Sequence, residues 1–202
     1  MCGVDTRIAE RSPWLRDLPP RVVTEVRRRR GVILASARGR VLDLDSPGAL
    51  EVVAAASSSA LGDIADDERY DTIVSTCRLI ALPDLLGALR ALRALLAVDG
   101  ELHLVEPVNH PGPTGLLISS AGSRFPVVVG MHLARDVVGA TRAAGLSVAD
   151  VERFSVATWV WPLRRFVQAR AIIIEAGSAD PDDPAHPSDS ARDPQINHEE
   201  PS

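Results

Sequence analysis

Short apolar runs typical of strands alternate with longer segments of helical periodicity along most of this chain. The runs Val41–Asp45, Asp71–Thr76 and Glu101–Glu106 are apolar and bounded by turn residues, as buried strands usually are. Segments with helical spacing lie between them, at about 47–60 and 84–97. Strands separated by helices of this length predict an α/β fold with a mainly parallel sheet and helices on both faces.

The ends of the chain's expected core extend this pattern. A helix is predicted from about Arg21 to Ala37, after a pair of prolines that favour a helix start. We interpret its Arg27–Arg30 run as a solvated helix face, with a surface that attracts anions or acidic lipid as the alternative. Asp84 is expected to cap the leucine-rich helix, and Asp99-Gly100 to end it. Further along, the sequence predicts a helix at about 133–144 and strands at about 147–154 and 168–175.

Length and composition indicate one globular domain with two tails. The chain has 202 residues, of which 46% are hydrophobic and 24% charged, enough apolar material for a core. From Ser178 onward it holds mostly proline, aspartate and serine, a composition that favours disorder. We therefore expect an N-terminal arm over 1–19, a folded domain over 20–177 and a disordered, acidic, proline-rich tail over 178–202.

The charge distribution argues against nucleic acid as a partner. The tail carries seven acidic residues against one arginine, so removing its net charge of −6 from the total of −5 leaves +1 for the rest. That is too weak a field to recruit nucleic acid. No transmembrane or signal segment is apparent, and cytoplasmic residence is expected. Cys2 and Cys77 lie far apart, so neither a disulfide nor a metal site is predicted.

The second half of the chain resembles the class I S-adenosylmethionine-dependent methyltransferases. The resemblance rests on Tyr-Asp-Thr-Ile-Val-Ser-Thr at 70–76, Leu-Pro-Asp at 82–84, the leucine-rich helix and Val-Asp-Gly-Glu-Leu at 98–102. It covers about residues 20–175 and implies a Rossmann-like domain that binds S-adenosylmethionine. The implied activity is methyl transfer to a small-molecule or lipid-like acceptor, with Ser75 near the methyl donor.

The first half departs from the family pattern, and two alignments are open. In one, Val41–Leu44 is the opening strand, so that Asp45, Pro47 and Ala49 replace the three glycines of the cofactor turn. In the other, which we favour slightly, Leu44–Glu51 resembles the family's second strand and helix. Asp45 would then bind the ribose.

The remaining cofactor contacts follow from the second alignment. Gly48 would help to hold the nucleoside, and Asp63 and Ile64 would flank the adenine. Asp43, as an acid at a strand end, is a further candidate cofactor ligand or a cap of the next helix. Weak or lost cofactor binding is compatible with either alignment, because the glycine turn is missing from both. No catalytic residue is assigned.

The spacing indicates a deletion. Only 30 residues separate Val41 from Asp71, where the family has about twice as many. We therefore expect a sheet reduced to about five strands, with the Val41–Leu44 strand at one side, shielded by the 21–37 segment, by a second copy or by a protein partner. The alternative function is a catalytically inactive homologue that serves as a binding or assembly partner.

Overall fold

A five-stranded sheet forms the centre of the molecule. The computed structural model describes residues 18–58, 65, 68–108, 131–133 and 135–173. The strands are β1 (Val41–Asp43), β2 (Tyr70–Thr76), β3 (Leu96–Pro107), β4 (Ser147–Ser155) and β5 (Arg165–Ile172). The helices are α1 (Pro20–Ser36), α2 (Ala49–Ser58), α3 (Leu85–Leu95) and α5 (Val137–Ala143), with short 3-10 turns η4 (Leu79–Ala81) and η6 (Trp161–Leu163).

The strand order is β1-β2-β3-β5-β4. The β1–β2 and β2–β3 pairs are parallel, whereas β5 is antiparallel to both β3 and β4. Four strands therefore run in one direction and β5 alone runs in the other. This arrangement confirms the expected mainly parallel, Rossmann-like α/β sheet.

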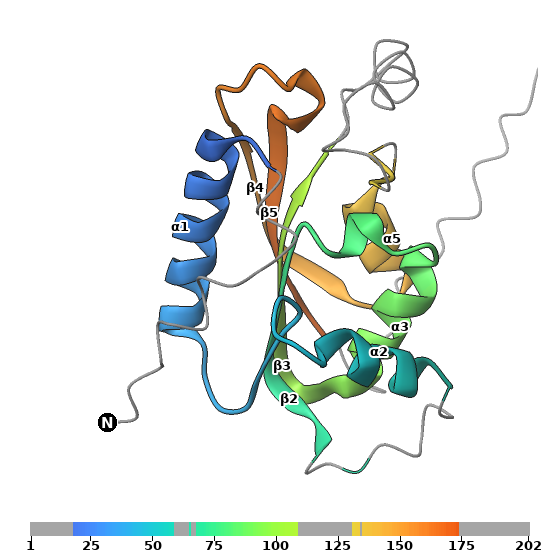
Figure 1. Ribbon diagram of the computed structural model, residues 1–202. Helices are drawn as coiled ribbons and strands as arrows, with labels where there is room; N and C mark the ends of the chain where they lie inside the picture. Colours follow the sequence, from blue (N-terminus) through green and yellow to red (C-terminus); the bar gives the residue numbers. More distant parts are fainter. Residues whose placement is uncertain (1–17, 59–64, 66–67, 109–130, 134, 174–202) are drawn as a thin grey trace, which may run out of the picture.

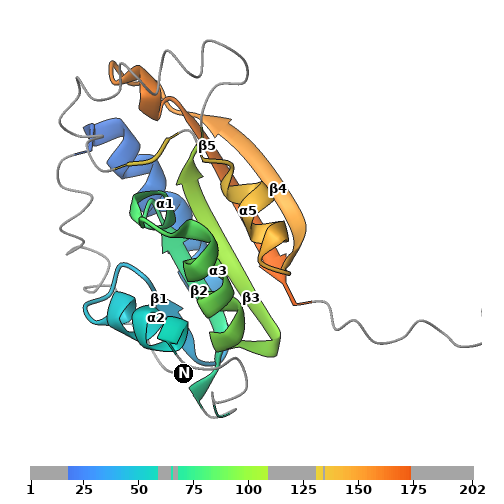
Figure 2. The same ribbon diagram turned by 90° about the vertical axis from the view of Figure 1, so that its right-hand side faces the viewer.

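The helices form two unequal layers. Figure 1 shows α1 alone on one face of the sheet and α2, α3 and α5 on the other, and Figure 2 looks onto the second layer. The connections from β1 to β2, from β2 to β3 and from β3 to β4 all step in the same direction across the sheet. Since such crossovers are right-handed, helices α2, α3 and α5 must share a face.

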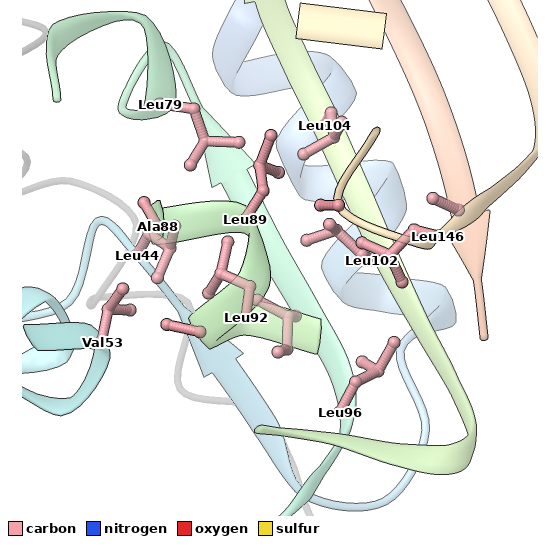
Figure 3. Close-up of a cluster of buried hydrophobic side chains, with 14 of the residues drawn as sticks. Leu44, Val53, Leu79, Ala88, Leu89, Leu92, Leu96, Leu102, Leu104 and Leu146 are labelled. Carbon is pink, nitrogen blue, oxygen red and sulfur yellow. The ribbon is translucent and has the colours of Figure 1, made fainter. Parts of the chain in front are cut away.

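Each face has its own apolar core. The larger cluster joins α2, α3 and α5 to the sheet, with leucines of α3 and β3 at its centre (Figure 3). The smaller cluster lies under α1, where Val22, Val26 and Ile33 pack near Val74 and Phe166. Among the described helices, none is long and apolar enough to cross a membrane.

Several boundaries differ from expectation. The Asp99-Gly100 pair does not end the α3 helix, because the chain becomes extended at Leu96 and β3 begins there. The pair instead lies where the β2–β3 register shifts, between Tyr70 paired with Leu96 and Thr72 paired with Glu101. Gly100 suits this position since a Cβ would lie 2.9 Å from the Tyr70 carbonyl oxygen. Strand β5 also starts three residues before the expected 168.

The edge position of the first strand is confirmed, but its expected cover is not. Strand β1 pairs only with β2 in the described sheet. Helix α1 packs on the sheet face against β2 and β3 rather than along the β1 edge. Residues 1–17 of the expected arm, residues 174–177 of the expected domain and the whole expected tail, 178–202, lie outside the described residues.

Candidate functional site

The carboxyl end of β1 carries the two acids that the sequence singles out. Asp43 ends the strand and Asp45 follows Leu44. The Asp45 carboxylate is fully buried, at 0% exposure, and lies between two arginines. Its Oδ1 accepts a hydrogen bond of 2.9 Å from Arg78 Nε, and its Oδ2 lies 3.5 Å from Arg30 Nε. Thr76 Oγ1 also donates to Asp45, which leaves this carboxylate closed off from solvent.

Arg30 reaches these acids from the α1 helix. It continues the buried stripe of Val22, Val26 and Ile33, and it is only 2% exposed. Its Nη2 donates to Asp43 Oδ2. Helical spacing places Arg30 on the core side of α1, so its charge requires a partner inside the domain. We call Arg30, Asp43, Asp45, Thr76 and Arg78 the Arg30–Asp45 network.

The turn after β1 uses its own backbone donors. The Asp45 N–H donates to Asp43 Oδ1 at 3.1 Å, the Ser46 N–H to the Asp43 carbonyl at 2.9 Å and the Ala49 N–H to the Ser46 carbonyl at 3.3 Å. Pro47 has no N–H. These groups are therefore not presented to a ligand in the way that a glycine-rich cofactor turn presents its amides.

Gly48 is explained by the turn alone. It is exposed and has φ +83°, a left-handed conformation that glycine adopts readily. A Cβ built on Gly48 would meet nothing within 4 Å. Close packing against another part of the described chain is therefore not what requires glycine here.

A second polar cluster lies on the opposite face of the sheet. Ser75 Oγ donates to Glu106 Oε1 at 2.7 Å, and both side chains are buried. The Leu79 and Ile80 amides of η4 also donate to the Glu106 carboxyl group, at 3.2 and 3.4 Å. Burial nevertheless raises the pKa of Glu106 to about 7, because loss of water outweighs these hydrogen bonds.

These contacts do not fit S-adenosylmethionine at the carboxyl end of β1. A ribose would need Asp45 to leave two arginines and a threonine, and a methyl donor near Ser75 would need access to a buried hydroxyl. The turn offers no row of amides for the methionine carboxylate. Asp63 and Ile64, expected beside the adenine, lie outside the described residues.

The sheet order bears on the two alignments. In a doubly wound sheet with order 3-2-1-4-5-6, the first strand lies beside the fourth. Strand β1 lies directly beside β2, the strand that begins the family-like second half of the chain. This position favours the alignment in which Asp45, Pro47 and Ala49 stand at the glycine positions, rather than the one that we favoured from sequence.

The sequence interpretation missed Arg30, Thr76, Arg78 and Glu106 as members of these clusters. For two of these residues, the sequence pattern could have predicted a buried position. Arg30 falls on the apolar stripe of α1, which corrects the interpretation of the whole arginine run as solvated. Glu106 continues the inward-facing alternation of Leu102 and Leu104 along β3. Charged residues at core positions indicate buried polar partners.

Comparison with known proteins supports the fold. No protein-family model and no curated protein sequence matches the chain. Among solved structures, a candidate methyltransferase from Bacillus halodurans is similar, with TM-score 0.50, 12% identity and 73% of this chain and 98% of that chain covered. The YcgJ protein of Bacillus subtilis is similar too, with TM-score 0.52, 12% identity and 72% and 97% covered. The chain therefore has the fold of the class I S-adenosylmethionine-dependent methyltransferases.

Proposed function

We propose that this chain is a methyltransferase-fold protein that binds its ligand or partner without using S-adenosylmethionine. The observation that carries the proposal is the buried Asp45 carboxylate, which Arg30, Thr76 and Arg78 hold inside the domain. Removing one member of such a network leaves a buried charge uncompensated. A ribose would have to replace all three of these interactions.

The topology supports the same proposal. Ligands of doubly wound sheets bind where the direction of strand connection reverses, in the crevice between helices on opposite faces. Here every crossover from β1 onward steps in the same direction, and α2 and α3 pack against one another on a single face. Within the described sheet there is thus no reversal beside β1 to open such a crevice.

Titration calorimetry of the full chain with S-adenosylmethionine and S-adenosylhomocysteine tests the proposal. Loss of about three backbone hydrogen bonds, each worth about 1 kcal/mol, weakens binding roughly a hundredfold. We expect dissociation constants weaker than about 100 μM for both compounds. Asp45→Asn is the matched variant because it keeps the size of the side chain, and circular dichroism verifies that it is folded.

The opposite result would assign a different function. Binding at low micromolar concentration that Asp45→Asn abolishes would place the nucleoside at β1. It would also favour an active transferase acting on a small-molecule or lipid-like acceptor. A folded Asn variant with the same weak response as the natural chain supports the non-catalytic function.

A further inference from the structure

A groove of about 1000 Å³ lies at the carboxyl edge of the sheet, between the start of α1 and the segment that joins β4 to β5. Figures 1 and 2 show these two parts side by side. Ser155 of β4 pairs with Arg165 of β5, and Phe166 pairs with Pro107 at the end of β3. The groove is therefore level with the strand ends where α/β folds bind ligands.

The described lining of the groove is basic. Arg21, Arg164 and Arg165 are exposed there, and none of the described lining residues is acidic. Within the described part of the chain, Arg21 and Arg165 form no ion pair. The nearby Glu25 does not neutralise them, because its carboxylate already accepts hydrogen bonds from Arg28 and Arg29. A concave surface of one charge attracts anions.

The groove also has an exposed aromatic wall, Trp159, which is 72% exposed. Its segment is fixed by hydrogen bonds: the Val156 N–H donates to the Arg164 carbonyl at 2.8 Å, and Arg164 Nε donates to the Thr158 carbonyl at 2.9 Å. Val160, next to the tryptophan, is fully buried. The segment that carries the exposed Trp159 side chain is therefore held in a fixed position. An exposed indole beside arginines provides apolar contact for a ligand.

We propose that this groove binds a phosphomonoester that carries an apolar ring or chain. Arg21 and Arg165 bind the phosphate group, since two or three guanidinium groups match a dianion and donate paired hydrogen bonds. The apolar part of the ligand packs on Trp159. The site goes beyond the function proposed above, because it uses none of the Arg30–Asp45 network and does not depend on whether S-adenosylmethionine binds.

The test uses 1-naphthyl phosphate as the probe and titration calorimetry of the full chain. The double variant Arg21→Ala/Arg165→Ala is expected to weaken binding at least about tenfold, as loss of charge-assisted hydrogen bonds does. Trp159→Ala is expected to weaken it roughly threefold or more. The control Arg27→Ala/Arg142→Ala removes the same charge from exposed arginines outside this groove, and it is expected to bind like the natural chain.

Two further arms identify the source of the phosphomonoester. Vesicles of phosphatidylcholine with phosphatidic acid present the same group on a lipid, and inorganic phosphate presents it without an apolar part. If the natural chain sediments with phosphatidic acid vesicles and the Arg21/Arg165 variant does not, the phosphomonoester comes from a lipid. If the natural chain binds 1-naphthyl phosphate but not the vesicles, the ligand is a soluble compound. The proposal is overturned if neither binds, if inorganic phosphate binds as tightly, or if the control variant loses as much.

Discussion

The guanidinium of Arg30 lies between the two carboxylates that follow one another at the end of β1. This arrangement provides charge compensation in a place without water, since Arg30 and Asp45 are both almost inaccessible. Attraction between buried charges is offset by the loss of their hydration. The network therefore contributes little net stability compared with an apolar core, yet loss of one member is costly.

Arg30→Met tests how costly it is to lose one member of the network. The variant keeps an unbranched apolar stem but removes the guanidinium group, which leaves Asp43 and Asp45 with less compensation, so we expect the free energy of unfolding to fall by about 3–5 kcal/mol. Arg27→Met, an exposed position on the same helix, should change it by less than about 0.5 kcal/mol. Urea unfolding of both variants measures the difference, and equal losses would show that Arg30 is not a buried ion-pair partner.

Glu106 makes stability depend on pH. Its pKa is raised from 4.5 to about 7 because the carboxyl group is buried, so the folded state keeps a proton that the unfolded state releases. The stabilisation is full below pH 4.5 and is lost as the pH rises through about 7. The loss approaches roughly 3 kcal/mol, at 1.36 kcal/mol per unit.

Urea unfolding at several values between pH 5 and pH 8 measures this contribution. Glu106→Gln cannot titrate but can still accept hydrogen bonds from Ser75 and Leu79, so its stability should be flatter over that range. If the free energy of unfolding changes with pH equally in the natural chain and in the Gln variant, Glu106 does not titrate between pH 5 and pH 8.

At the scale of elements, periodicity predicts the helices and strands well, but not where they begin and end. The Asp84 cap is confirmed, since its Oδ1 accepts from the Gly87 N–H at 2.9 Å. The prediction that Asp99-Gly100 ends the leucine-rich helix was wrong, because the same residue types also suit a register shift inside a strand. The contacts of Asp45 could not be read locally, because its partners come from residues 30, 76 and 78.

Gly31 and Gly87, two of the three glycines in the described helices, offer a matched pair at the scale of elements. Gly31 lies on the exposed side of α1, where a Cβ would meet nothing within 4 Å. Gly31→Ala should therefore raise the free energy of unfolding by about 0.5–1 kcal/mol. At Gly87 a Cβ would lie 2.2 Å from Asp84 Oδ2. Displacing this cap costs about 1 kcal/mol, so Gly87→Ala should give no net gain.

Thermal and urea unfolding of both alanine variants show whether the loss of the Asp84 cap offsets the gain in helix propensity at Gly87. A stabilisation of the same size at the two positions would mean that the Asp84 cap adjusts without cost. The comparison is internal because the substitution is identical and only the surroundings of the new methyl group differ.

At the scale of the whole molecule, strand order decides what can be built at the sheet's carboxyl edge. The sheet ends at β1 on one side and at β4 on the other. The shortened β1 side is where the crevice of a doubly wound fold would open. The basic groove lies instead toward the β4–β5 side. Since fold does not determine function, the proposed ligand site in this groove does not depend on whether S-adenosylmethionine binds at the end of β1.

Both described sheet edges are poorly suited to strand pairing between copies. Strand β1 has only three residues, too few for a stable edge-to-edge ladder. Strand β4 has nine residues, but it carries Asp150, Glu152 and Arg153, and its register shifts between Val148 and Asp150. Short strands, charged side chains and bulges at sheet edges all oppose such pairing.

We therefore expect the chain to be a monomer of 21.6 kDa in size-exclusion chromatography with light scattering, at concentrations up to about 100 μM, where edge pairing of so few residues is negligible. A dimer would contradict this expectation. The variant Val41→Lys then tests where the copies meet, because it adds a charge to an exposed position of β1. A dimer that this variant dissociates would establish the β1 edge as the interface and restore the assembly function expected from the shortened sheet.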